Sequence, residues 1–250
     1  IRAASLLPKL ADEKNIIFAF NNNSIQSIFN NLDYGGILDD KRNQDIGRLN
    51  DFLAISEANI CINKANINVV RETKYNVAFK NKVESKLVHT LKNDGDKEYK
   101  AYIRVFTPLG SRLTSISFNQ DKQTIVPAVT DFRTYERPNF KPPQGLEVDE
   151  IIDHNLQVFG FIVSINPKKT EEIEITYDNG LILPNEAIVT YSLSVIKQSG
   201  IEKYPFTLSL SYGDNFAPKE VENAKLEGSS IIIERKINKD EVIEMKLIKG

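Results

Sequence analysis

The 250-residue sequence has little of several residue types that commonly carry chemistry. It contains one cysteine, Cys61, together with two histidines and no tryptophan. A single cysteine excludes an intrachain disulfide and a zinc site built from cysteines. One cysteine is also typical of exported proteins, in which unpaired thiols are hazards, although chance explains the low count equally well. No stretch approaches the roughly 20 apolar residues that a transmembrane helix needs.

The numbers of basic and acidic residues are nearly equal. The chain has 32 basic and 34 acidic residues, a formal net charge of −2, so it lacks the basic footprint of a nucleic-acid-binding protein. With 41% hydrophobic and 26% charged residues, the composition excludes a disordered or collagen-like chain. The length fits one large domain or two small ones.

Motifs for nucleophilic or phosphate chemistry are missing as well. The sequence has no Gly-x-Ser-x-Gly elbow and no phosphate loop of the Walker or Rossmann type. We therefore expect no cofactor and no active site contained wholly within this chain.

The first fifty residues differ from the rest. Two helices are expected, and between them Ile16–Phe20 is predicted as a short buried strand, while Gly35-Gly36 ends the second helix. Ser24 is the expected N-cap of that helix. The two helical faces comprise Ala3, Leu6, Leu7 and Leu10, and Ile25, Ile28, Phe29 and Leu32. The order helix, strand, helix predicts a small α/β subdomain over residues 1–70. Because the chain begins at Ile1 and not at a methionine, we expect this subdomain to be the end of a larger upstream domain.

From Asp51 onward the hydrophobic period changes to two, and turn residues separate short apolar runs. This pattern predicts a mainly β protein, with an immunoglobulin-like antiparallel β-sandwich over residues 71–250. Later strands are expected at 112–118, 156–165, 171–177, 187–197, 205–212, 220–226, 230–237 and 242–248.

A proline-rich stretch at about 119–155 lacks periodicity, so it is predicted as an irregular, mobile insertion. Its acidic end carries Asp149, Asp153 and His154, which are weak candidates for binding a cation that prefers oxygen ligands. The alternative, which we favour, is that these charges are solvated.

Several segments together resemble the C-terminal part of the bacterial domain-of-unknown-function family numbered 4012. The segments that carry this resemblance are Glu13–Ile16, Tyr34–Gly36, Asp51–Ala54, Asn59–Ile60, Asn63–Asn66, Arg71, Gly95, Tyr99–Gly110, Phe159–Phe161, Pro167, Ile173–Tyr177, Tyr191–Leu193 and Lys197–Gly200. The sequence departs from the family pattern at Ile67-Asn68 and at Ser199. The resemblance implies the extracytoplasmic part of a cell-envelope protein, attached to the membrane through an anchor outside this sequence. It implies no catalytic residue.

Arg104 is the strongest candidate binding residue. It alternates in phase with Tyr102 and Phe106, so its guanidinium is expected between two aromatic rings. With Lys100 and Lys86 expected nearby in a paired strand, this face suits an anionic glycan or a polymer phosphate. The alternative is an ordinary exposed strand face on which the charge pairs with Glu84.

Asn63, Lys64 and Asn66 form, with Asn59, a polar group directly after an apolar strand. Asparagine amides satisfy main-chain groups where a strand bends, so a structural role is expected at the junction of the two subdomains. The alternative is a cleft in which the amides bind sugar hydroxyls. His89, on the apolar phase of its strand, is expected to be a core histidine.

Three classes of function follow from these observations. The first is a non-enzymatic envelope module that supports another domain or contacts cell-wall or surface polymers or another envelope protein. The others are an accessory part of an envelope enzyme with its active site upstream, and a self-assembling surface subunit that uses exposed strand edges.

Overall fold

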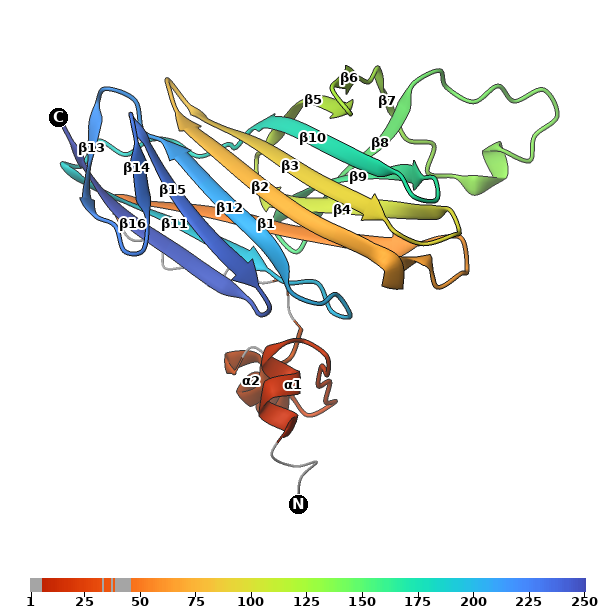
Figure 1. The fold of residues 1–250 in the computed structure, drawn as a ribbon, viewed down its shortest axis with the longest axis horizontal. Helices are drawn as coiled ribbons and strands as arrows, with labels where there is room; N and C mark the ends of the chain where they lie inside the picture. Colours follow the sequence, from red (N-terminus) through yellow and green to blue (C-terminus); the bar gives the residue numbers. More distant parts are fainter. Residues whose placement is uncertain (1–5, 33, 37, 39–45) are drawn as a thin grey trace.

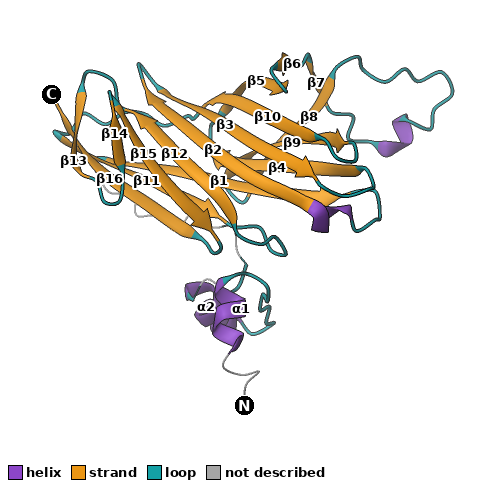
Figure 2. Ribbon diagram, in the orientation of Figure 1, coloured by secondary structure: helices purple, strands orange, loops and turns teal. Residues whose placement is uncertain are grey.

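The computed structural model describes residues 6–32, 34–36, 38 and 46–250. Strands account for 53% of the chain and helices for 9%, which confirms the expected mainly β class. Two twisted sheets lie one over the other, and the N-terminal helices lie beyond one side of them (Figure 1). Strands run through both layers, and helix is concentrated in the N-terminal segment (Figure 2).

Each sheet has eight strands. In order across the first sheet these are β13 (Phe216–Glu220), β16 (Glu241–Lys249), β11 (Ile188–Ile196), β1 (Arg48–Asn59), β4 (Tyr99–Pro108), β9 (Leu156–Ile165), β8 (Leu146–Asp153) and β7 (Ile125–Pro127). The second sheet follows the order β14 (Lys225–Glu227), β15 (Ser230–Ile237), β12 (Tyr204–Ser211), β2 (Val69–Phe79), β3 (Val83–Asn93), β10 (Thr170–Asp178), β5 (Arg112–Phe118) and β6 (Asp121–Lys122).

Both sheets are mixed, so the prediction of a purely antiparallel sandwich is wrong. β1 pairs with β11 in parallel, and β2 pairs with β12 in parallel. In each sheet, the parallel pairing joins a group of strands from the first part of the chain, which ends at β10, to a group from the last part, which begins at β11. Hydrophobic alternation fixes which face of a strand is buried but carries no information about the direction of its neighbour.

The core lies between the two sheets. The inward residues of each strand alternate with exposed ones, as in β3, where Val83, Leu87 and Leu91 are fully buried. Contacts cross the layers: the rings of Phe159 on β9 and Tyr177 on β10 have centroids 5.9 Å apart. One continuous cluster therefore holds the sheets face to face.

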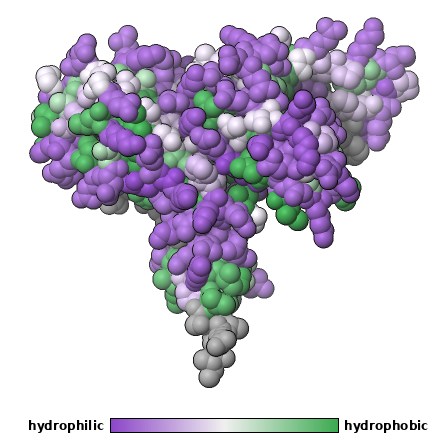
Figure 3. All heavy atoms as spheres, in the orientation of Figure 1, coloured by the Kyte–Doolittle hydropathy of each residue, from purple (hydrophilic) through white to green (hydrophobic). Residues whose placement is uncertain are grey.

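A smaller apolar cluster lies on the outer face of the first sheet. Phe52, Ala54, Phe106 and Val158 are buried there, and Leu38 of the N-terminal segment packs on them. β1 is thus buried on both of its faces around residues 51–54. The N-terminal segment is part of the sandwich packing, because it covers a face that would otherwise be apolar and exposed. Elsewhere, the visible surface is mostly hydrophilic (Figure 3).

The N-terminal segment contains α1 (Leu7–Asp12) and α2 (Asn23–Asn31). Asn22, rather than Ser24, caps α2 by accepting hydrogen bonds from two backbone N–H groups. The predicted strand at 16–20 is wrong: these residues form a loop, and Phe18 packs on Phe29 of α2 with ring centroids 4.9 Å apart. Ala3, also expected in the first helix, lies outside the described residues.

The later part of the chain follows the strand predictions closely. The strands expected at 112–118, 156–165 and 230–237 are β5, β9 and β15. The one expected at 220–226 is wrong, because a turn there separates β13 from β14. The stretch predicted as irregular at 119–155 contains β6, β7, β8 and a short 3-10 helix, η3 (Phe132–Thr134), which leaves a loop at 128–145.

Residues 48–59, assigned to the N-terminal subdomain from the sequence, form β1 in the middle of the first sheet. None of the helices in the described part of the chain has the length and apolarity needed to cross a bilayer.

Candidate functional site

The outer face of β4 carries the side chains that the sequence singled out. The Arg104 guanidinium lies over the Phe106 ring, 5.3 Å from its centroid. Tyr102 makes a different contact, donating from its hydroxyl to Asp149 Oδ2 at 3.2 Å. Arg104 has no carboxylate partner within the described ranges. Of the two expected aromatic contacts, the structure therefore shows the one with Phe106.

The expected neighbours of Arg104 on an adjacent strand were wrong. Lys86 and Glu84 lie on β3, which belongs to the other sheet. Lys86 Nζ pairs there with Glu174 Oε2 at 2.6 Å. The sequence run from residue 83 to 108 resembles a simple hairpin, but its two strands belong to different layers.

Arg104 borders a cavity of about 300 Å³ between the outer face of the first sheet and the N-terminal segment. Three cationic residues line it, together with Ser56, Phe106 and Gln198, and no carboxylate among the described residues does. The cationic residues are Lys14, Arg104 and Lys197. We call this cavity the cationic pocket.

The two lysines of the cationic pocket are held by short contacts. Lys14 Nζ is 2.6 Å from Asp240 Oδ2. Lys197 Nζ donates to two backbone carbonyls, of Glu13 at 2.8 Å and of Gln198 at 3.2 Å. Burial lowers the pKa of Lys197, although the charges of nearby carboxylates oppose this. An ammonium group has three donors, and these two contacts engage two of those of Lys197.

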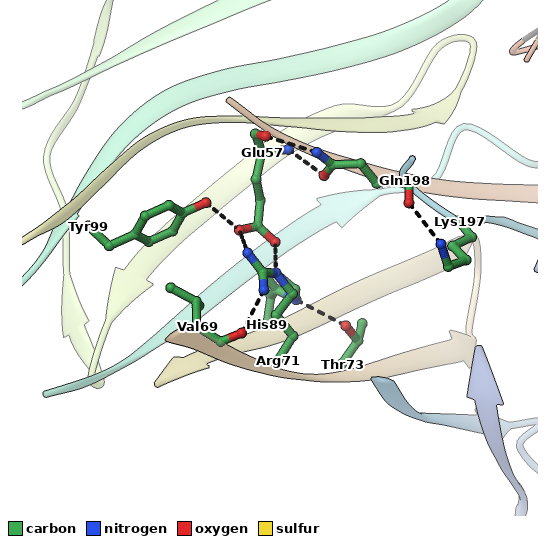
Figure 4. Close-up of polar contacts among 8 residues, drawn as sticks. All are labelled: Glu57, Val69, Arg71, Thr73, His89, Tyr99, Lys197 and Gln198. Carbon is green, nitrogen blue, oxygen red and sulfur yellow. Dashed lines mark hydrogen bonds and ion pairs between the residues drawn. The ribbon is translucent and has the colours of Figure 1, made fainter. Parts of the chain in front are cut away.

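A buried ion cluster is centred on Glu57 of β1, the residue that follows Ser56 of the cationic pocket (Figure 4). Arg71 donates to both carboxylate oxygens of Glu57, at 2.8 and 3.0 Å. Tyr99 donates to Oε2 at 2.7 Å. His89 Nε2 lies 3.3 Å from Oε1, and its Nδ1 lies 3.0 Å from Thr73 Oγ1. This confirms His89 as a core histidine with partners on both nitrogens.

The electrostatics of Glu57 indicate a structural role. Burial acts to raise its pKa, but the hydrogen bonds and charges of His89 and Arg71 outweigh burial and lower the pKa to about 2. A carboxylate that is ionised and saturated with donors is a poor general acid or base at neutral pH. We therefore assign this cluster to stability and not to catalysis.

The backbone of Glu57 helps to position one wall of the cationic pocket. The Gln198 side chain accepts from the backbone N–H of Glu57 at 2.7 Å and donates to its carbonyl at 2.9 Å. Gln198 directly follows Lys197, so this paired contact fixes the segment that presents the lysine (Figure 4).

A second buried carboxylate, Asp51, lies on the same inward phase of β1. Tyr191 and Tyr75 donate to its Oδ2 at 2.6 and 2.9 Å, and the backbone N–H of Phe52 donates to Oδ1 at 2.7 Å. Burial raises its pKa, against the effect of these hydrogen bonds. The sequence analysis did not single out Asp51 or Glu57 as buried acids. The pattern that could have indicated them is that both lie an even number of residues from the buried Leu53, on the same face of the strand.

The candidate cation ligands do not converge. Asp149 accepts from Tyr102, whereas Asp153 Oδ1 pairs with His154 Nδ1 at 2.6 Å. Within the described residues no group of three His, Cys, Asp or Glu side chains is placed to hold a metal ion.

Asn59 and Asn63 bond the backbone, as expected, but the Asn66 side chain makes no such bond within the described residues, and the group connects the two sheets instead of joining two subdomains. Asn59 donates to the carbonyl of Asn63 at 2.7 Å, and Asn63 donates to the carbonyl of Glu98 at 3.1 Å. Asn63 also accepts from the N–H of Ala65 at 2.9 Å. Lys64 and Asn66 are exposed. Asn59 ends β1, and the other three residues lie in the β1–β2 connection, which contains the 3-10 helix η2 (Ala65–Asn68). None of the four lines the cationic pocket.

No protein-family model matches the sequence, and no curated protein does. Among solved structures, a nutrient-binding protein from Legionella pneumophila is similar, at 11% identity over 82% of this chain and 71% of that one, with a TM-score of 0.49. An M1 zinc metallopeptidase from Deinococcus radiodurans is 5% identical over 72% of this chain and 42% of its own, with a TM-score of 0.38. Yeast leukotriene A4 hydrolase in complex with bestatin is 10% identical over 72% of this chain and 29% of its own, with a TM-score of 0.39. Matches at this level support no assignment of activity.

Proposed function

We propose that the chain is a non-enzymatic, extracytoplasmic binding module of a membrane-anchored bacterial envelope protein, and that it contacts an anionic surface polymer through the cationic pocket. The envelope location and the anchor outside this sequence rest on the resemblance of its segments to an envelope family. The polymer contact rests on the pocket.

One observation carries the polymer contact: Arg104, which has no carboxylate partner within the described residues, shares with Lys14 and Lys197 a cavity that no described carboxylate lines. The chain as a whole has a net charge of −2, so a generally basic surface does not explain this arrangement. Arg104 presents a planar fork of donors that matches phosphate or carboxylate oxygens, and its stacking on Phe106 holds that fork in place. Ser56 and Gln198 add neutral polar groups to the wall.

Self-assembly through strand edges receives less support from the structure. The edge strands β14, β6 and β7 have only three, two and three residues, and the edge strand β13 contains Pro218. Short or proline-containing edges offer few free backbone groups to a neighbouring chain.

Binding of purified poly(glycerol phosphate) to the wild-type chain and to Arg104→Ala tests the proposal. Since hydrogen bonds to charged groups contribute about 1.5–3 kcal/mol, we expect Arg104→Ala to weaken binding by about tenfold or more. Lys86→Ala, on the other sheet, is the matched control. Equal affinities of Arg104→Ala and Lys86→Ala would contradict the proposal.

A further inference from the structure

A second cavity, of about 480 Å³, lies on the same sheet where the loop at 128–145 meets β8 and β9. Two tyrosines and two carboxylates line it, over a wall of apolar residues. The polar residues are Tyr102, Tyr135, Glu147 and Asp149, and the apolar wall includes Val129, Leu146 and Ile162. We call this cavity the tyrosine pocket.

The hydrogen bonds within the tyrosine pocket commit both of its phenol hydroxyls as donors. Tyr135 donates its hydroxyl to the carboxylate of Glu147, at 2.6 and 2.7 Å from the two oxygens. The backbone N–H of Val129 donates to the same carboxylate at 2.9 Å. Tyr102 donates to Asp149 at 3.2 Å. The carboxylate and phenol oxygens keep further lone pairs, so these groups present acceptors to a ligand.

The tyrosine pocket has a charge opposite to that of the cationic pocket. No lysine, arginine or histidine of the described chain lines it, while Glu147 and Asp149 do. Its shape depends on Gly160: a Cβ there would lie 2.2 Å from the Tyr102 hydroxyl oxygen, so the glycine allows the tyrosine to lie across β9. Tyr135 is 46% exposed, which leaves part of its surface open to a ligand.

We propose that the tyrosine pocket binds an alkylammonium group. Three N–H donors on a positive charge match a site that presents two carboxylates and phenol oxygens. Tyrosine faces also attract a cation, and the apolar wall accommodates an alkyl stem. A neutral sugar fits less well, because its hydroxyl oxygens need donors, and with both phenol hydroxyls committed the side-chain donor left is the Thr130 hydroxyl. An anion is disfavoured by the negative charges of the two carboxylates that line the tyrosine pocket.

The placement of the tyrosine pocket suggests where the ammonium comes from. Tyr102 and Arg104 share one face of β4, two residues apart, which is about 7 Å along a strand. The cationic pocket and the tyrosine pocket are therefore neighbours on one sheet. We assign the ammonium to an amine substituent of the anionic polymer; this source rests on the proposed function, whereas the preference for an alkylammonium does not.

Titration of ethanolamine against the isotope-labelled chain, followed by the NMR shifts of backbone amides, tests the tyrosine pocket. We expect saturable shifts at Val129 and Glu147, and no saturation with ethylene glycol, which lacks the charge. Glu147→Gln and Tyr135→Leu should each weaken ethanolamine binding by about fivefold or more, because each loses a contact to the charged group.

Glu150→Gln is the matched control, since it makes the same charge change on the same strand outside the pocket, and thermal melting verifies that each variant folds. Equal affinities of Glu147→Gln and Glu150→Gln, or equal binding of ethylene glycol, would overturn the proposal.

The polymer source is tested separately with poly(glycerol phosphate) that does or does not carry alanyl esters. We expect the esters to strengthen binding to the wild-type chain but not to Glu147→Gln, while Arg104→Ala weakens binding of both forms. If ethanolamine binds and the esters have no effect, the alkylammonium site stands and the polymer as its source is overturned. If neither polymer binds, the proposed function fails, and the ethanolamine titration still decides the site.

Discussion

Replacing Arg71 by methionine should destabilise the sandwich strongly. The change keeps an unbranched side chain of similar length but removes both donors that Arg71 gives to the Glu57 carboxylate, at 2.8 and 3.0 Å. Glu57 would then remain buried with His89 and Tyr99 as its side-chain partners. Breaking a buried ion pair by removing one partner costs about 3–5 kcal/mol. We expect a loss of this size in urea unfolding at pH 7.

The pH dependence of the wild-type chain gives an independent estimate. The pKa of Glu57 falls from an ordinary 4.5 to about 2 in the folded protein. Because one pKa unit corresponds to about 1.4 kcal/mol, the ionised Glu57 contributes about 3 kcal/mol to stability. A carboxyl with a lowered pKa stabilises fully above its unfolded value. This contribution is therefore present above pH 4.5 and disappears as the pH falls toward 2.

Comparing wild type, Arg71→Met, Glu57→Gln and the double variant completes the test. We expect the two single changes to be non-additive, with the double variant more stable than their sum predicts, because the second change removes the carboxylate that the first left unpaired. The Glu57→Gln chain should also show a flatter stability profile between pH 4.5 and 2. A cost of Arg71→Met below about 1 kcal/mol, the range of exposed ion pairs, would refute the reasoning.

Three further predictions follow from the described contacts. Tyr191→Phe should cost about 1–3 kcal/mol in urea unfolding, because it removes the 2.6 Å hydrogen bond to buried Asp51; an unchanged midpoint would contradict this. Asn63→Ala should destabilise by about 1 kcal/mol, since it leaves two backbone groups unpaired, whereas the exposed Asn66→Ala should stay within about 0.5 kcal/mol of wild type. Limited proteolysis should cut within 128–145 before any other site past residue 46. Tyr135→Phe should be cut faster than wild type, because it lacks the hydrogen bond to Glu147 that holds this loop on β8. Slower cutting of that variant would contradict this role of the hydrogen bond.

Local features of the sequence determined most of the strands. Alternation with period two, ended by turn residues, located β5, β9 and β15 with the bounds that the structure shows. The same alternation placed His89 in the core. These features are encoded within a few consecutive residues, so no knowledge of the fold was needed to find them. The loop at Ile16–Phe20 shows the limit: five apolar and aromatic residues suit a strand, but no strand of the described residues pairs with them, and Phe18 and Phe20 pack on Phe29 of α2 instead.

The pairing of strands was decided only by the tertiary structure. Nothing in β1 itself specifies that β11 lies parallel to it, or that β3 and β4 belong to different sheets. The polar sites depend on these pairings. Glu57 and Arg71 meet because β1 and β2 face each other across the core, and Arg104 and Lys197 line one cavity because β11 and β4 flank β1. Such contacts join residues that are distant in sequence, and the free energy that selects them comes from burying both sheets at once, which no local pattern records.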